Sequence, residues 1–213
     1  MEEKQNNQVT DSKPADLLSF TVEELLNLPA IVLASASPRR AEILRTVGWP
    51  FEAFAVDVDE SRNKDEAAPT YVERLACEKA AAAAIHRPSR LVLGADTVVV
   101  VDDEILGKPQ DEEGARRMLR RLSGRWHEVL TGVALVNGQS SRPIVAREIT
   151  QVRFAAISEV EINWYVSTGE PMDKAGAYAI QGRGARLIEE IKGDYFNVVG
   201  LPVRLLYKLV QKL

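Results

Sequence analysis

The stretch that most constrains the fold is the apolar, β-branched run from residue 91 to residue 101, which contains a single carboxylate, Asp96. Such runs are typical of buried strands, so the sequence predicts strand segments over 90–94 and 97–101, separated by the Gly-Ala-Asp triplet that ends at Asp96. Asp102-Asp103 then indicates the turn of a hairpin. Burying an unpaired carboxylate is costly, so Asp96 either lies at a bulge or an exposed strand end, or needs a metal, a cation or water beside it.

Strands and helices alternate along the rest of the chain. The apolar periodicity and the turn signals predict strands over 30–34, 51–58, 128–136, 144–154 and 186–191, and helices over 38–47, 70–85, 111–122, 158–169 and 202–213. Asn137-Gly138 is a hairpin signal between two long strands. In a chain of 213 residues, this order predicts a single α/β (α+β mixed) domain with a central, twisted, partly antiparallel mixed sheet flanked by helices.

The first 29 residues differ in composition from the rest. Residues 1–16 are polar and acidic without an apolar core, which is typical of a disordered tail. Thr21-Val22-Glu23-Glu24 matches a helix start, and Pro29 ends the short helix that follows. We therefore expect an N-terminal extension over 1–29, partly disordered with a short helix, and one domain over 30–213.

Charge and cysteine content indicate the kinds of partner and the compartment. Lys plus Arg total 27 and Asp plus Glu total 31, a net charge of −4, so no global basic field is available to bind nucleic acid. From the polar residues 1–16 we expect no secretory signal, and the apolar run around Asp96 is well short of the roughly 20 residues that span a bilayer. A single cysteine, Cys77, cannot form an intrachain disulfide, which favours a reducing compartment. The sequence thus predicts a cytoplasmic protein without a membrane or nucleic-acid partner.

The first candidate site follows the strand predicted at 30–34. Ser35-Ala36-Ser37-Pro38 opens a helix, where unpaired backbone N–H groups and the helix dipole attract anions. Arg39 and Arg40 add guanidinium groups that suit phosphate oxygens. A capped helix with two surface arginines is the alternative interpretation of this short motif.

Acidic and basic residues elsewhere indicate phosphate and metal chemistry. Asp57, Asp59 and Glu60 form a cluster of hard oxygen ligands, which suit Mg²⁺ or Mn²⁺ bound together with substrate phosphates, although such clusters are usually solvated loops. Lys79 and Lys108 add two positive charges, unless they are ordinary surface residues. Carboxylates combined with Arg and Lys are the groups that phosphoryl transfer requires.

A glycine-rich segment at 173–184 contains another candidate, Gln181. Its carboxamide can accept from N3–H of uracil or thymine and donate to a ring carbonyl, but when flipped it also serves cytosine. Discrimination therefore depends on neighbours that fix its orientation, and a purely structural turn is the alternative. His86 and His127 are too few and too isolated to supply a zinc site.

Several ordered motifs together resemble the Maf family of nucleotide pyrophosphatases. They are Leu-Ala-Ser-Ala-Ser-Pro-Arg-Arg at 33–40, Gly-Ala-Asp-Thr at 94–97, Gly-Lys-Pro at 107–109, Leu-Ser-Gly at 122–124, Asp-Lys-Ala-Gly at 173–176 and Asn-Val-Val-Gly-Leu-Pro at 197–202. The resemblance covers about residues 30–213. Ordered motifs over that whole length are far more specific than any one of them.

The resemblance implies a Maf/ITPase-like fold and hydrolysis of a nucleoside triphosphate at the α–β linkage, with a divalent cation, Mg²⁺ or Mn²⁺, as cofactor. It implies that Asp96 is the proton acceptor. Carried over motif by motif, it makes Arg39, Thr97 and Gln181 specificity residues, Ser35, Arg40, Lys79 and Lys108 phosphate ligands, and Glu60 and Asp96 metal ligands. A homodimer is also compatible with the family.

Ala-Tyr-Ala-Ile-Gln at 177–181 resembles the dTTP/UTP branch of the family rather than the branch that prefers 7-methyl-GTP. We therefore expect a pyrophosphatase acting on dTTP and UTP, with modified pyrimidine nucleotides as further candidates. One alternative is a pyrophosphatase for noncanonical purine nucleoside triphosphates. The other is a non-catalytic nucleotide-binding regulator of septum formation, suggested by the link of the family to cell division arrest.

Overall fold

The computed structural model describes residues 28–137 and 142–213. The helix predicted to start at Thr21 and residue 138 of the predicted hairpin turn lie outside these ranges. Within them, no helix is both long and apolar enough to cross a membrane.

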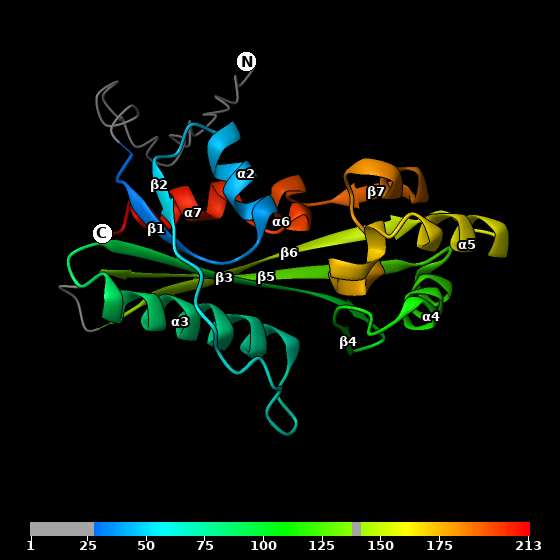
Figure 1. The fold of residues 1–213 in the computed structure, drawn as a ribbon, viewed down its shortest axis with the longest axis horizontal. Coiled ribbons are helices and arrows are strands. Elements are labelled where there is room, and N and C mark those ends of the chain that lie inside the picture. The colour runs from blue at the N-terminus through cyan, green and yellow to red at the C-terminus, as the bar shows by residue number, and fades with distance from the viewer. Residues whose placement is uncertain (1–27, 138–141) are drawn as a thin grey trace, which may run out of the picture.

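A mixed sheet of seven strands forms the centre of the molecule. The strands lie in the order β2 (Phe51–Ala53), β1 (Ile31–Ala34), β3 (Leu91–Val101), β5 (Trp126–Asn137), β6 (Ile144–Phe154) and β7 (Ile188–Lys192), while β4 (Glu104–Leu106) also pairs with β3. β1 is parallel to β2 and β3, and the remaining pairs are antiparallel. The long, twisted strands β3, β5 and β6 run the length of the molecule (Figure 1), which confirms the predicted fold class.

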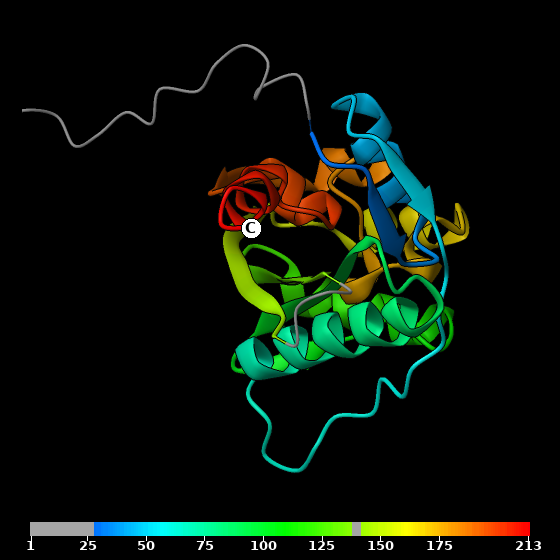
Figure 2. The ribbon, with the colours of Figure 1, turned by 90° about the vertical axis from the view of Figure 1, so that its left-hand side faces the viewer.

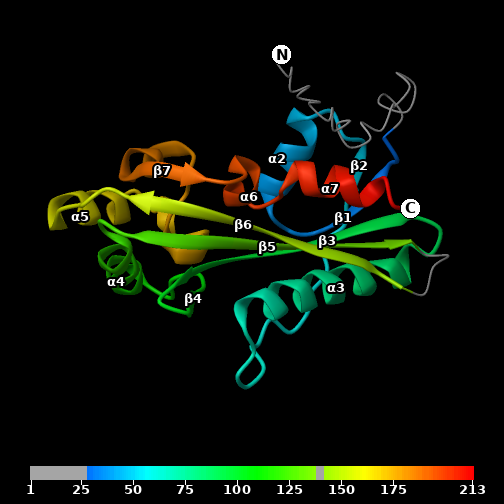
Figure 3. The ribbon, with the colours of Figure 1, turned by 180° about the vertical axis from the view of Figure 1, so that it is seen from behind.

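Helices cover both faces of this sheet. They are α2 (Pro38–Thr46), α3 (Ala68–His86), α4 (Glu112–Leu122), α5 (Glu159–Ser167), α6 (Tyr195–Val199) and α7 (Val203–Val210), with 3₁₀ turns η1 (Glu170–Asp173), η2 (Ala175–Ala177) and η3 (Gly182–Leu187). The long helix α3 lies on one face, and α2, α6 and α7 lie on the other (Figures 1 and 3). α4, α5 and the 3₁₀ turns gather at the far end of the long strands.

Side-chain alternation in β1 explains why both faces need a cover. Successive residues of a strand point to opposite faces. Ile31 and Leu33 belong to the buried cluster on the side of α2 and α7, whereas Val32 and Ala34 pack with alanines of α3. The four-residue strand is therefore buried on both faces, between α2 above it and α3 below it in Figure 2.

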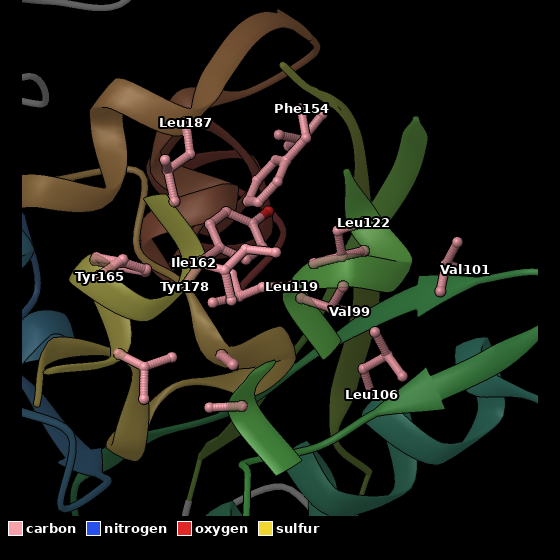
Figure 4. Close-up of a cluster of buried hydrophobic side chains, with 14 of the residues drawn as sticks. Val99, Val101, Leu106, Leu119, Leu122, Phe154, Ile162, Tyr165, Tyr178 and Leu187 are labelled. Carbon is pink, nitrogen blue, oxygen red and sulfur yellow. The ribbon is translucent and has the colours of Figure 1, made fainter. Parts of the chain in front are cut away.

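A separate apolar cluster fills the far end of the long strands. Phe154 of β6, Tyr178, Leu119 of α4 and Ile162 of α5 meet there, and their side chains point toward one another (Figure 4). Tyr178 and Phe154 contact each other edge to face, with ring centroids 4.8 Å apart. This cluster fixes the segment around Tyr178 against the sheet.

Two glycines let α3 lie directly on the sheet. A Cβ at Gly94 of β3 would be 2.0 Å from the carbonyl oxygen of Ala76, and one at Gly132 of β5 would be 2.2 Å from that of Val72. Because any larger residue would push the helix away, these two positions set the height of α3 above the strands. They thereby set the height of Lys79 above Asp96.

Several predicted boundaries were wrong. β3 is one continuous strand through Asp96, because residues 94–96 pair in register with β5. The strand predicted over 51–58 ends at Ala53, because its partner β1 is only four residues long. The last strand and the last helix are Ile188–Lys192 and Val203–Val210. The hairpin turn at Asp102-Asp103 is confirmed, with positive φ angles of 52° and 60°.

Candidate active site

The candidate site lies where one edge of β3 is left open. β1 pairs with residues 91–94 of β3, and β4 pairs with residues 99–101. Among the described residues, no strand pairs with 95–98 on this edge. Asp96 and Thr97 lie in this gap, and their side chains point to opposite faces of the sheet, toward α3 and toward α2 respectively.

A cavity of about 580 Å³ surrounds this gap. Its walls come from the β1–α2 turn, the segment after β2, α3, the middle of β3, β4 and the segment after it, β5, the chain on either side of η2, and the end of α6. All nine predicted site residues line it: Ser35, Arg39, Arg40, Glu60, Lys79, Asp96, Thr97, Lys108 and Gln181. The fold therefore brings together residues that are up to 146 positions apart in the sequence, between Ser35 and Gln181 (181 minus 35).

Lys79 is the central cation of the α3 side of the cavity. Its Nζ lies 2.7 Å from Oδ1 of Asp96 and 2.6 Å from Oε1 of Glu60. Burial raises the pKa of Asp96, while the positive charges of Lys79 and Arg40 counteract that rise. Partial burial also acts to raise the pKa of Glu60, but the hydrogen bond and charge of Lys79 outweigh it and lower that pKa. The buried carboxylate at Asp96 thus has the cation that its burial requires.

Arg40 is the central cation on the opposite side of β3. Its side chain is 8% exposed, and burial lowers the pKa of its guanidinium while Asp96 acts to raise it. Nε donates to the carbonyl oxygen of Gly200 at 2.9 Å, Nη1 to Oγ of Ser35 at 3.0 Å, and Nη2 to Oγ1 of Thr97 at 3.0 Å. Three separate segments therefore hold this guanidinium in one orientation.

The β1–α2 turn presents a helix N-terminus to the cavity. Pro38 occupies the first turn of α2, where its missing N–H costs nothing. The N–H of Ser37 donates to Oγ of Ser35 at 3.2 Å, which keeps the turn tight. Ser37 itself makes no side-chain cap, so the first turn of the helix faces the cavity as an anion-binding end.

Some cavity residues carry contacts that the sequence did not reveal. Arg39 Nη1 pairs with Oδ2 of Asp173 at 2.9 Å, which connects α2 to η1 across the cavity. Oγ1 of Thr97 lies 3.0 Å from Oγ1 of Thr131 on β5. Thr131 is fully buried, where a hydroxyl needs a partner. This contact had no signal in the sequence, because a threonine fits any buried strand.

The carboxylates of the cavity fit a divalent cation that shares its coordination with substrate. Glu60 and Asp96 both pair with the ammonium of Lys79, so the two carboxylates reach a common point that favours positive charge, and a metal ion there would replace the ammonium. In the described part of the chain, no three His, Cys, Asp or Glu side chains form a metal-binding group. One or two carboxylates completed by phosphate oxygens and water is the usual ligand set of Mg²⁺. Asp57 and Asp59, the other acidic candidates, do not line the cavity.

Comparison with known proteins agrees with these motifs. The family model described as Maf-like protein matches residues 30–213. The chain is 57% identical over 183 residues to the dTTP/UTP pyrophosphatase of Symbiobacterium thermophilum, covering 86% of this chain and 92% of the relative. It is 50% identical over 182 residues to the dTTP/UTP pyrophosphatase of Clostridioides difficile, covering 85% and 94%.

Among solved structures, the Ham1 protein of Staphylococcus aureus aligns with a TM-score of 0.47 and 15% identity, covering 75% of this chain and 79% of that one. A likeness this slight carries no argument about function. The family model, in contrast, extends over the whole sheet and every wall of the cavity, and the first of these relatives covers 86% of the chain. The chain belongs to the Maf family.

Proposed function

We propose that this protein hydrolyses dTTP and UTP at the α–β linkage and releases the nucleoside monophosphate and pyrophosphate. The observation that carries the proposal is the convergence of a buried carboxylate, Asp96, and three cations, Arg40, Lys79 and Lys108, around one cavity. Positioned cations and a carboxylate are the groups that phosphoryl transfer to water requires. The relatives named dTTP/UTP pyrophosphatase support the same reaction and substrates.

The triphosphate is proposed to lie along the first turn of α2. Ser35 and the N-terminal N–H groups of the helix offer donors, and the helix dipole favours anions there. Arg40 is already held by three acceptors, so its guanidinium needs no reorganisation to meet a phosphate. Lys79 and Lys108 line the same cavity and supply positive charge as pyrophosphate departs.

Asp96 is proposed to accept the proton of the attacking water. Burial raises the pKa of Asp96, and a more basic carboxylate is a better proton acceptor, while Lys79 and Arg40 favour the ionised form that this role needs. The water oxygen then bonds to the α-phosphorus, and the bond from that phosphorus to the bridging oxygen breaks. The electron pair of the broken bond leaves with pyrophosphate.

The proposed cofactor is Mg²⁺ or Mn²⁺, which Glu60 and Asp96 would hold. When bound, the ion would neutralise charge on the phosphate oxygens. Glu60 and Asp96 both reach the ammonium of Lys79, so an ion that took the place of this ammonium would contact both carboxylates. Chelation with EDTA should therefore abolish turnover, and added Mg²⁺ or Mn²⁺ should restore it.

The base is proposed to contact the segment that carries Gln181. This exposed side chain lines the cavity and makes no hydrogen bond within the described residues, so its carboxamide is available to a uracil or thymine edge. Arg39 and Thr97 stay predicted specificity residues. The cytoplasmic location and the homodimer also stay predictions.

The test is pyrophosphate release from dTTP, UTP, CTP, dATP, GTP, ITP and 7-methyl-GTP with Mg²⁺ or Mn²⁺. Release mainly from dTTP and UTP supports the proposal. A purine preference would overturn the substrate assignment while keeping the reaction. Tight binding without pyrophosphate release would instead favour the non-catalytic regulator.

A further inference from the structure

A buried histidine, His127 of β5, lies behind the cavity wall and has no part in the reaction proposed above. Its Nε2 is 2.7 Å from Oη of Tyr178, and the two residues are 3% and 5% exposed. Burial lowers the pKa of His127 to about 4, so the imidazole is neutral near pH 7. Its Nδ1 is buried without a partner, which makes the bond to Tyr178 the only hydrogen bond of this side chain within the described residues.

Aromatic contacts pack His127 and Tyr178 against each other and against Phe154. The rings of His127, Phe154 and Tyr178 are mutually edge to face, with centroids 4.8 to 5.3 Å apart. Figure 4 shows Tyr178 and Phe154 inside the apolar cluster at the far end of the long strands. Tyr178 also lines the nucleotide cavity, so one side chain connects the core to the cavity wall.

Tyr178 lies three residues before Gln181 on a segment that has little room to move. Gly176 and Ala177 have positive φ angles of 68° and 59°. A Cβ at Gly176 would lie 2.9 Å from the side chain of Val99 on β3, so the backbone touches the sheet there. The chain therefore arrives at Tyr178 in a fixed position.

A second anchor follows directly. Oη of Tyr165 accepts from the N–H of Ala179 at 3.1 Å and donates to Oε1 of Glu170 at 2.9 Å. Glu170 accepts from the N–H groups of Arg183 and Gly184 at 3.1 and 3.0 Å. The backbone is thus tied on both sides of Gln181, whose side chain makes no hydrogen bond within the described residues and lines the cavity.

We propose that His127 and Tyr178 are positioning residues for recognition of the nucleobase: their hydrogen bond fixes the backbone of 178–181 and thereby the carboxamide of Gln181. This inference rests on the proposed function, because the base belongs to that substrate. The residues proposed to act on the phosphates lie on other elements: Asp96 on β3, Lys79 on α3 and Arg40 on α2. The His127–Tyr178 pair therefore affects selection of the base and leaves these three residues in place.

The direct test is Tyr178→Phe, which removes one oxygen and keeps the ring. The readout is the ratio of kcat/KM for UTP to that for CTP. We expect this ratio to fall about three- to tenfold, the range that the net contribution of one hydrogen bond allows, with kcat for UTP nearly unchanged. The exposed Tyr195 provides the matched control, and Tyr195→Phe should leave the ratio unchanged.

Losing only the tyrosine hydroxyl leaves a second buried nitrogen of His127 without a partner, which costs stability. The double variant His127→Phe/Tyr178→Phe removes both polar partners and keeps three aromatic rings in the cluster. It should show the same lower ratio with stability closer to that of the wild type. An unchanged ratio in both variants, with only thermal stability reduced, would show a purely structural role and overturn the inference.

The route through Gln181 is tested by combining variants. If Tyr178 acts through that carboxamide, Tyr178→Phe should change the ratio in the wild type but add nothing in a Gln181→Ala background. An equal change in both backgrounds would overturn the inference.

Binding of α,β-methylene UTP and α,β-methylene CTP to the same variants gives the ratio of the two Kd values without turnover. Absence of hydrolysis by the wild type would therefore count against the proposed function alone. The Kd ratio would still test whether His127 and Tyr178 affect base selection. Equal affinity of the wild type for the two analogues would overturn the inference.

Discussion

The buried carboxylate of Asp96 is stabilised by the ammonium of Lys79. The apolar surroundings of β3 disfavour the ionised carboxylate, and the ammonium of Lys79, 2.7 Å away, compensates for this. The same ammonium holds Glu60 on its other side. The result is a carboxylate that is more basic than usual and faces a cavity lined by cations.

Asp96→Asn should therefore abolish most turnover without unfolding the protein. The amide is nearly the same size, and Lys79 keeps its partner Glu60. Loss of the proposed general base should lower kcat for dTTP by roughly a hundredfold to ten-thousandfold. Asp103→Asn, at the exposed hairpin turn, is the control. Near-normal kcat in Asp96→Asn would remove Asp96 from its assigned role.

Single residues could be predicted where they carry a charge in an unusual place. Asp96 was identifiable because it interrupts a β-branched run, and Arg40 because it opens a helix after a buried strand. The acceptor of Arg40 at Gly200 was not identifiable, because a backbone carbonyl has no signature in the sequence. Thr131 was hidden for a related reason, since a β-branched threonine fits any buried strand.

The open edge of β3 depends on the lengths of two neighbouring strands. β1 ends at Ala34, opposite Gly94, and β4 ends at Leu106, opposite Val99, so no strand of the described residues pairs with 95–98 on that edge. Strand lengths of three or four residues follow from tertiary pairing, which explains why the prediction for 51–58 was too long. The order of strands and helices could be predicted from periodicity, but the gap between β1 and β4 could not.

The contact of α3 with the sheet can be tested at Gly132. In Gly132→Ala, the new Cβ would be 2.2 Å from the carbonyl oxygen of Val72 and would push α3 away from β5. We expect the free energy of unfolding to fall by about 3 kcal/mol, at the upper end for overpacking, and activity to fall because Lys79 moves. Gly107→Ala has free space around its Cβ and should keep its stability in urea unfolding. Equal stability of the two variants would contradict this packing.

The segment that carries Glu60 is fixed at its end by an ion pair between the buried Glu66 and the partly buried Arg74. Glu66 is 8% exposed and accepts from Nε and Nη2 of Arg74, each at 2.8 Å. Arg74 also donates to the carbonyl oxygen of Ser61 at 3.0 Å, and Tyr71 donates to that of Glu60 at 2.7 Å. The position of Glu60 over the cavity therefore depends on residues outside the cavity as well.

This ion pair predicts a particular dependence of stability on pH. The hydrogen bond with Arg74 lowers the pKa of Glu66 from 4.5 to about 2, so the folded state favours the ionised carboxylate. The stabilisation is complete above about pH 4.5 and is lost as the pH falls through about 2. In urea unfolding at a series of pH values, Glu66→Gln should weaken the acid dependence in that window. Exposed Glu42→Gln is the control, and identical curves for wild type and Glu66→Gln would contradict the assignment.

The molecule as a whole places its cavity between two packed ends of one sheet. The end with β1, α2 and α7 supplies the proposed phosphate contacts of Ser35, Arg40 and the first turn of α2. The end with α4, α5 and the 3₁₀ turns supplies the proposed base-binding segment (Figure 1). Asp96, the proposed proton acceptor, lies on β3, which passes through both ends. Substrate contacts to both ends would explain why the whole of 30–213 carries family motifs.

The predicted domain boundary can be tested by shortening the chain. Leu28 packs against the core cluster next to α2, and Nε1 of Trp49 donates to the carbonyl oxygen of Pro29 at 3.1 Å. A chain beginning at Leu28 should keep its unfolding free energy within about 0.5 kcal/mol and should keep its pyrophosphate release. A chain beginning at Ile31 should lose about 1 kcal/mol or more. Loss of stability or activity in the first truncation would place essential contacts within 1–27.

The most direct measurement of the proposed reaction is hydrolysis of dTTP in isotopically labelled water, followed by mass spectrometry of both products. Attack of water on the α-phosphorus places the heavy oxygen in dTMP and leaves pyrophosphate unlabelled, which is the predicted result. Label in pyrophosphate would show attack on the β-phosphorus. Release of orthophosphate would show cleavage at the terminal linkage, and either outcome would contradict the reaction assigned to this cavity.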